Sequence, residues 1–309
     1  MSLGLCCMYM VEKKSRNGTI KLINAMDCKT LQFGAFNAGK YSDEFILEIY
    51  QNNVNNLKKM LKIILADGIK VFRISSELLP LFDIVKESIY NHASILNALK
   101  EIGDFVKANN MRLSMHPDQF VVLSSATQRI IDNGVKILAY HNWIFDRMGL
   151  DNSPFYAINV HGGARGRLST LVDTISKLPD NIRGRLTLEN DESSYNVKEL
   201  MGVYNQTGVP CLFDTHHHTF NDAGISIEEG MELALSSWGS IKGLTHLSNT
   251  TPGLENGSFV ERRKHSDYIH YIPECQRIAN NSGRIDIEIE AKQKQLSVMK
   301  MVKDFDIAL

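Results

Sequence analysis

The 309-residue sequence lacks the features that mark secreted, membrane-spanning or disulfide-stapled proteins. Its five cysteines contain no CxxC pair and no even set spaced as a disulfide framework, so we interpret them as reduced thiols of an intracellular protein. The N-terminus lacks the apolar core of a signal peptide, and no apolar run approaches the roughly 20 residues of a membrane span. These absences predict a soluble intracellular protein without a membrane partner.

The sequence also lacks a linker and a strong charge of either sign. No Pro/Gly/Ser-rich or low-complexity stretch divides it, so we expect a single domain over residues 1–309. Lys and Arg total 34 against 35 Asp and Glu, so a nucleic-acid binder of this composition would need a local basic rim or bound cations. No obligate protein partner is evident, and we expect a monomer.

Short apolar runs alternate with segments of helical periodicity along the whole chain. The predicted strands are residues 3–9, 70–75, 112–116, 155–161, 185–189, 210–214, 242–247 and 285–290. The predicted helices are residues 42–66, 90–110, 127–149, 168–178, 196–207, 226–237, 266–281 and 292–306. Eight strands alternating with eight helices predict an α/β protein with a closed (β/α)8 TIM barrel.

The main alternative fold is an open doubly wound sheet, which would usually carry a Gly-rich phosphate turn after its first strand. Residues 4–18 contain no such turn, so the barrel is favoured. The polar, Gly- and Asn-rich stretch 10–41 is expected to form a long loop after the first strand, on the active-site face.

Histidines and carboxylates repeatedly occupy the last residue of a predicted strand. They are His116, His161, Glu189, Asp214, His246 and Glu290. The C-terminal ends of barrel strands meet at one open end, the mouth, where the active sites of such barrels lie. Imidazole and carboxylate ligands together suit manganese, zinc or iron. One strand-terminal histidine is more often a hydrogen-bonded core residue, but six such groups predict a catalytic metal site.

Three further residues are candidate ligands. His217 lies in a D-x-x-H unit that begins with Asp214, although the run of three histidines at 216–218 could be a solvated loop. His265 stands just before a predicted helix. Glu77 follows the second strand. It could be a metal ligand or a carboxylate at the start of a helix, and the two interpretations are about equally well supported.

Several segments together resemble the UV damage endonuclease family, which is related to endonuclease IV type abasic-site nucleases. They are FRISSELLPL at 72–81, RLSMHPDQF at 112–120, NVHGG at 159–163, LTLENDE at 186–192, FDTHHH at 213–218, THLSN at 245–249, HSDYI at 265–269 and IEAK at 289–292. They occur in family order over nearly the whole chain. The resemblance implies a metal-dependent DNA repair endonuclease that nicks one strand 5′ to UV photoproducts and other distorting lesions.

The resemblance also implies two or three divalent metals at the mouth, commonly manganese, with zinc or magnesium possible. His116, His161 and Glu189 would hold one metal. Glu189 would bridge to a second, completed by Asp214, His246 and Glu290, and His217 and His265 would belong to a third. A third metal in relatives needs a further ligand, and Leu244, at one of the places for it, cannot coordinate. Glu77 stands where some relatives carry histidine.

The expected partner is damaged double-stranded DNA. The resemblance places the polar–aromatic pair Gln119 and Phe120 where the family probes the duplex, and a side-chain wedge of this kind unstacks a base step. Packing of Phe120 under the loops is the alternative. Tyr9 lies near a tyrosine that the family often carries at the end of strand 1, and its contact with DNA stays open.

Basic residues cluster in three predicted loops, where each cluster alone could be only a solvated face. They are Lys13, Lys14 and Arg16; Arg165 and Arg167; and Arg262, Arg263 and Lys264. Around one mouth they would form a rim that contacts phosphates.

Three other functions remain open from the sequence. An abasic-site endonuclease of endonuclease IV type would use the same metals. A metal-dependent sugar isomerase would share the barrel but leave the basic loops unexplained. A damage-binding protein without catalysis would not need the complete set of six ligands.

Overall fold

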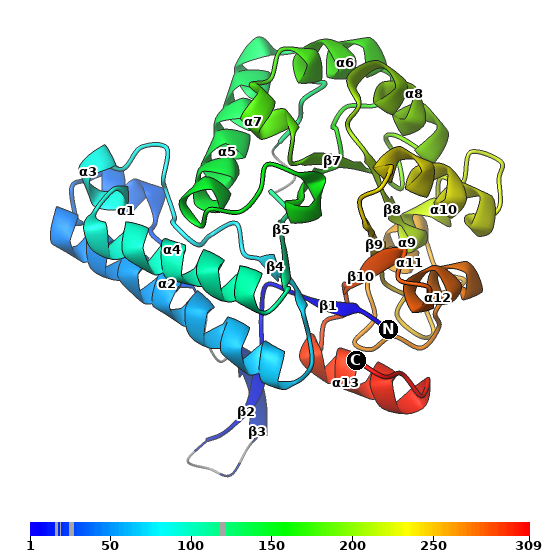
Figure 1. Ribbon diagram of the computed structural model, residues 1–309, viewed down its shortest axis with the longest axis horizontal. Helices are drawn as coiled ribbons and strands as arrows, with labels where there is room; N and C mark the ends of the chain where they lie inside the picture. Colours follow the sequence, from blue (N-terminus) through cyan, green and yellow to red (C-terminus); the bar gives the residue numbers. More distant parts are fainter. Residues whose placement is uncertain (16–17, 19, 25–27, 118–120) are drawn as a thin grey trace.

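Eight parallel strands close into a barrel, which confirms the predicted TIM-barrel fold (Figure 1). The computed structural model describes residues 1–309 except 16, 17, 19, 25–27 and 118–120. The barrel strands, in chain order, are β1 (Leu3–Cys6), β4 (Val71–Ile74), β5 (Arg112–Met115), β6 (Ile158–Val160), β7 (Leu186–Glu189), β8 (Cys211–Asp214), β9 (Gly243–Leu247) and β10 (Ile285–Ile289). Spatial neighbours follow this order, and β1 closes the ring by pairing with both β4 and β10.

Helices surround the barrel and bury one apolar face against it. The longer ones are α2 (Asp43–Ala66), α4 (Ala93–Ala108), α5 (Gln128–Arg147), α6 (Leu168–Ser176), α8 (Val197–Thr207), α10 (Ile227–Leu235), α12 (Glu274–Asn281) and α13 (Gln295–Asp304). The short ones are α1 (Phe33–Asn37), α3 (Glu87–Tyr90), α7 (Asp180–Arg183), α9 (Thr215–His218), α11 (Phe259–Arg262) and the 3-10 turns at Pro154–Tyr156 and Ser236–Trp238. No described helix is both apolar enough and long enough to cross a membrane.

Several elements are shorter in the structure than the sequence predicts, and two of them have a local cause. The helix expected over residues 266–281 is confined to α12, because Pro273 disfavours helical geometry in the residue before it and caps the helix start. The first strand, expected over residues 3–9, stops at Cys6, since Cys7 adopts a positive φ of 64° that extended backbone does not allow.

The prediction that residues 10–41 form a loop over the active-site face is wrong. This stretch contains an antiparallel hairpin of β2 (Met10–Lys14) and β3 (Ile20–Asn24), followed by α1. Figure 1 shows the hairpin projecting outward from the ring of helices, beside the end of α2 and near α13. The Gln295 side chain exchanges two hydrogen bonds with the backbone of Met10, which fixes the base of the hairpin there.

The floor of the barrel combines an apolar cluster with a buried ion pair. Near the N-terminal ends of the strands, Val71, Ala157, Leu212 and Leu244 pack together with Trp238 as an apolar floor. Strand side chains two residues apart share a face, so the next inward layer above Leu212 and Leu244 consists of Asp214 and His246. The buried ion pair between Arg112 and Asp286, 3.1 Å long, lies in register with Val71 and Leu244, so the floor is partly charged, while the imidazoles and carboxylates of the ligand type lie nearer the mouth.

Candidate metal centre at the barrel mouth

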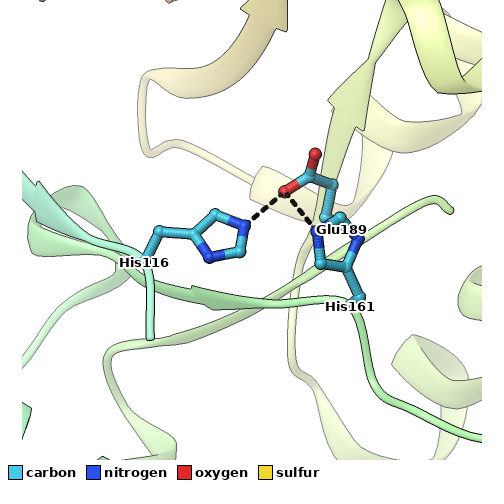
Figure 2. A group of neighbouring side chains, drawn as sticks. All are labelled: His116, His161 and Glu189. Atoms are coloured by element: carbon cyan, nitrogen blue, oxygen red, sulfur yellow. Dashed lines mark hydrogen bonds and ion pairs between the residues drawn. The ribbon is translucent and has the colours of Figure 1, made fainter. Parts of the chain in front are cut away.

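Three side chains from successive strands meet at one side of the mouth (Figure 2). His116 follows β5, His161 follows β6, and Glu189 ends β7. The Oε2 atom of Glu189 lies 3.1 Å from Nε2 of His116 and 4.0 Å from Nε2 of His161. One donor atom from each residue lies within 4.8 Å of the other two, so this group could hold a metal ion.

Glu189 also belongs to a second group, with Asp214 at the end of β8 and His246 on β9. The Nδ1 atom of His246 lies 3.1 Å from Oε1 of Glu189 and 3.9 Å from Oδ2 of Asp214. All three side chains are buried. Glu189 thus presents Oε2 to the first group and Oε1 to the second, which is the arrangement expected of a carboxylate that bridges two ions.

Glu290, directly after β10, lies at the edge of the second group. Its Oε1 atom is 3.5 Å from Nδ1 of His246 and 2.5 Å from Nη1 of Arg73 on β4. Oε2 of the same carboxylate lies 3.8 Å from Nδ1 of His265. The structure therefore brings Glu290 and His265 to the mouth, and it adds Arg73, which the sequence analysis did not single out.

His217 lies between two acidic regions of the mouth. Its Nδ1 atom is 3.2 Å from Oε1 of Glu189 and 3.8 Å from Oδ2 of Asp214, while its Nε2 atom is 3.5 Å from Oε2 of Glu192. Burial alone would lower the pKa of His217, but Asp214 and Glu189 outweigh burial and raise it well above its usual value. The candidate ligand His217 therefore places its imidazole against the shared carboxylate.

The site is strongly polarised even as bare protein. Burial would raise the pKa of Glu189, but His246 and His161 hold it well below its usual range. Burial would lower the pKa of His246, but the carboxylates of Glu189 and Glu290 raise it well above its usual range. The Glu189 carboxylate is therefore charged near neutral pH, and the histidine protons occupy positions that cations could take.

The residues fit a divalent metal. The Oδ2 atom of Asp214 is buried and accepts no hydrogen bond from the described residues, although a buried carboxylate oxygen without a partner is costly. Mixed imidazole and carboxylate donors suit manganese, zinc or iron. The first group and Glu290 line a cavity of 520 Å³, which is wide enough to admit a substrate group beside them, whereas Asp214 and His246 are buried behind its lining.

Two predicted site residues lie elsewhere. Glu77 is exposed and lines a different cavity, between Leu31 and α5, so the structure does not bring it to the metal groups. The hydroxyl of Tyr9 donates to Oδ2 of Asp67 at 2.7 Å, at the end of α2 that faces away from the mouth. In both cases the chain leaves the strand end in a direction that the local sequence does not specify.

The predicted DNA contacts are only partly gathered at the mouth. Arg263 lines the cavity, and Lys264 is exposed beside it. Arg165 is exposed directly after the cavity-lining Ala164, whereas Nε of Arg167 donates to the carbonyl of Ser124 at 2.8 Å. Lys13 and Lys14 lie on the outward hairpin, away from the mouth. Gln119, Phe120 and Arg16 fall outside the described residues.

Besides Arg73, sequence reasoning missed four charged or polar groups of this site. Asp191 and Glu192 follow Glu189 and line the cavity, and Oδ2 of Asp191 lies 3.4 Å from Nδ1 of His161. His216 also lines the cavity. Glu288 lies within the barrel, 3.1 Å from Nε2 of His246. Its position two residues before Glu290 on one strand was the available signal, because alternate residues share a face.

Comparison with known proteins identifies the family. A model of the family described as UV-endonuclease UvdE matches residues 1–308. The UV DNA damage endonuclease of Nostoc sp. is 33% identical over 303 residues, covering 96% of this chain and 88% of that protein. The enzyme of the same name from Deinococcus radiodurans is 30% identical over 270 residues, covering 84% and 85%.

Solved structures agree. The crystal structure of SacUVDE superposes with a TM-score of 0.81 at 28% identity, covering 99% of both chains. L-ribulose 3-epimerase reaches a TM-score of 0.51 at 13% identity, a likeness that shows the barrel fold alone. The resemblance seen in the sequence motifs is therefore confirmed, and the chain belongs to the UV-endonuclease UvdE family.

Proposed function

We propose that this chain is a divalent-metal-dependent DNA repair endonuclease that nicks the phosphodiester 5′ to UV photoproducts and other distorting lesions. The observation that carries the proposal is Glu189, a buried carboxylate whose two oxygens face two separate ligand groups. Its family relatives bear the name UV DNA damage endonuclease. A paired-ion site and a basic rim are what hydrolysis of a DNA phosphodiester needs.

Each ligand has an assigned part in this proposal. His116, His161 and Glu189 hold the first ion; Glu189, Asp214, His246 and Glu290 hold the second. When bound, such ions supply a hydroxide nucleophile near neutral pH and neutralise charge on the phosphate. The protein keeps Glu189 ionised and directs the imidazoles of His116 and His246 toward it. The 520 Å³ cavity gives the phosphate access from the mouth.

We propose two manganese ions as the working cofactor, with zinc or magnesium as alternatives. A third ion near His217 and His265 has less support. Leu244 belongs to the apolar floor, and the guanidinium of Arg263 is ion-paired with Glu192, which lies beside His217. A fixed cation thus already occupies this side of the cavity. Because the Glu192 carboxylate is already paired with Arg263, few charged ligands would remain for a third ion.

The DNA would approach over the loops that follow β6 and β9. Arg165, Arg263 and Lys264 are the cations placed to contact phosphates, and Arg167 would join them only by releasing the carbonyl of Ser124. We retain Gln119 and Phe120 as the proposed probe of the duplex on the strength of the family resemblance. Glu77 and Tyr9 have no part in the proposed site.

We further propose that residues 1–309 act as one domain and as a monomer inside the cell. In support, β1 and β10, near opposite ends of the chain, are neighbours, so barrel closure needs nearly the whole sequence. Light scattering coupled to size-exclusion chromatography tests the oligomeric state.

The nearest alternative is an abasic-site endonuclease, since the same ligands would hydrolyse either lesion's phosphodiester. The test uses three matched duplexes, which carry a single UV photoproduct, a single abasic site or no lesion. Each is incubated with the metal-stripped protein, alone and after addition of manganese. We expect manganese-dependent nicking immediately 5′ to the photoproduct and little nicking of the intact duplex.

The other outcomes separate the remaining functions. Nicking confined to the abasic duplex would support the abasic-site alternative. Binding of damaged DNA without nicking under any metal would indicate a damage-binding protein. If neither nicking nor preferential binding occurs, the nucleic-acid function is wrong, and a sugar isomerase assay becomes the next test.

A further inference from the structure

A short segment beside the cavity, Ser258–Lys264, holds two apolar side chains out to solvent; we call it the α11 segment. Phe259 is 40% exposed and Val260 is 65% exposed. Arg263, at the end of the same segment, lines the cavity together with Phe220. Val260 and Arg263 are three residues apart on one helical turn, so they lie on the same side of it. The exposed apolar pair therefore adjoins the candidate active site.

The backbone of the α11 segment is fixed at both ends. Ser258 and Glu261 form a capping box at its start. At its end, the hydroxyl of Thr250 donates to the carbonyl of Arg262 at 2.7 Å, and the backbone N–H of Thr251 donates to the carbonyl of Lys264 at 2.9 Å. Side chains on such a backbone are presented in a fixed place, which lowers the entropy lost when a partner binds them.

Two arginines are stacked on aromatic rings within this surface. The guanidinium of Arg262 lies 5.3 Å from the ring centroid of Phe220, and that of Arg263 lies 5.3 Å from the ring centroid of Phe259. The two rings meet edge to face with centroids 5.5 Å apart. Stacking of this kind leaves the N–H donors at the rim of the guanidinium free to meet an anion, which at Arg263 would replace the paired carboxylate of Glu192.

We propose that Phe259 and Val260 form a second DNA contact, packing on deoxyribose and on the base step beside the lesion while Arg262 and Arg263 engage the flanking phosphates. The proposal rests on the proposed function. Aromatic and cationic side chains alternate in this way where proteins hold nucleic acid with unstacked bases. The three consecutive cations Arg262, Arg263 and Lys264 favour a polyanion over an apolar protein as the occupant.

The contact would favour damaged duplex over intact duplex. A stacked, regular helix offers an apolar side chain little apolar surface, and opening a base step costs a few kcal/mol. A lesion that has already weakened stacking lowers that cost. Apolar groups beside the nicking site would thus contribute to discrimination, whereas the neighbouring arginines would contribute to affinity for both duplexes.

The test compares Val260→Ser with Ile278→Ser, a change of the same kind at a 58%-exposed isoleucine on α12, outside the cavity lining. Affinities for lesion-containing and intact duplexes are measured with the manganese-loaded protein and a methylphosphonate at the nicking position, which resists hydrolysis. A 2-aminopurine base next to the lesion reports unstacking by fluorescence. Val260→Met, which keeps an apolar side chain, is the conservative variant.

We expect Val260→Ser to reduce the ratio of damaged to intact affinity roughly tenfold, in line with the loss of one buried apolar side chain. The 2-aminopurine signal should fall with it, while Val260→Met and Ile278→Ser keep both values. Unchanged discrimination and fluorescence in Val260→Ser would overturn the proposal, and equal losses in Ile278→Ser would also overturn it. If the unaltered protein binds both duplexes equally and nicks neither, the proposed function has failed instead.

Discussion

The Nε2 atom of His246 lies 3.1 Å from the buried Oε2 atom of Glu288, on the side of the ring opposite Glu189. The imidazole is thus held between two carboxylates. A metal held at Nδ1 would leave the ring proton on Nε2, which faces the Glu288 carboxylate in an ion contact rather than a hydrogen bond. The hydroxyl of Ser114 donates to the other oxygen of Glu288, so this carboxylate is itself fixed. Carboxylates that hold a ligand histidine in this way raise its basicity and fix its orientation.

Glu288→Gln should weaken manganese binding by about 10- to 100-fold, the usual cost of losing such a partner. The amide keeps the shape of the side chain but not its charge. Isothermal titration of metal-stripped protein measures the effect, and circular dichroism checks the fold. Ser114→Ala, which removes only the contact to the other oxygen, should have a smaller effect. Equal metal affinity in Glu288→Gln and the unaltered protein would contradict the role of Glu288.

Glu189→Gln should keep the fold and abolish nicking. The change removes the charge that faces both ligand groups while preserving the volume of a buried side chain. Ion-assisted charge stabilisation is worth several kcal/mol, so single-turnover nicking should fall by about a thousandfold or more. Near-normal nicking by a folded variant would show that the bridging role is wrong.

The metal-free protein should lose stability as the pH rises from 6.5 to 8. The pKa values of His246 and His217 are raised in the folded state against the effect of burial, by carboxylates that include Glu189. A raised pKa adds stability that is complete below the unfolded value of about 6.5 and is lost as the pH rises toward the folded value. His141, His161 and His216, whose pKa values burial lowers, oppose this decline by only about 0.4 kcal/mol each over the window, because their unfolded forms still bind protons near pH 6.5.

Thermal unfolding across this pH range measures the effect. The slope can reach about 1.4 kcal/mol per pH unit for each histidine that stays protonated only in the folded state. Saturating manganese should remove the decline, because metal replaces those protons. Metal-free Glu189→Gln should decline less steeply. A metal-free protein whose stability is flat or rising from pH 6.5 to 8 would refute the charge arrangement.

Arg263→Ala should weaken binding of both damaged and intact duplex. The guanidinium lines the cavity and is ion-paired with Glu192, a pair that a phosphate could replace. Loss of one phosphate contact lowers the slope of log affinity against log salt by about one. Arg183→Ala removes an exposed arginine paired with Asp180 on α7, outside the cavity lining, and serves as the control. Identical slopes in the two variants would argue against a phosphate contact at Arg263.

Gly103→Ala should destabilise the barrel by roughly 1–3 kcal/mol or more, the cost of forcing an extra methyl into packed structure. A Cβ at this position of α4 would lie 1.7 Å from the carbonyl oxygen of Met148, at the end of α5. Gly202→Ala on α8 meets no atom within 4 Å and should instead be neutral or stabilising. Denaturant unfolding of both variants provides the comparison, and equal stability would contradict the tight helix contact.

The order of strands and the ligands at their ends can be predicted from the sequence because both depend on local patterns. An apolar run that ends in a histidine or carboxylate defines the strand and its last side chain together. Parallel closure then brings all such ends to one mouth, which is why the sequence alone identifies His116, Glu189, Asp214 and His246 as neighbours. The apolar floor that includes Leu244 follows from the same alternation of faces.

Where the chain goes after each strand was decided by tertiary structure. Glu77 and Tyr9 each lie three residues past a strand end, yet one turns toward α5 and the other is hydrogen-bonded to Asp67. The same holds for the pairing of Arg263 with Glu192, which joins loops about 70 residues apart. The sequence of a strand by itself determines which of its side chains share a face and toward which end of the barrel it runs. The path of a loop instead depends on packing partners that are distant in sequence, and these become neighbours only when the barrel closes.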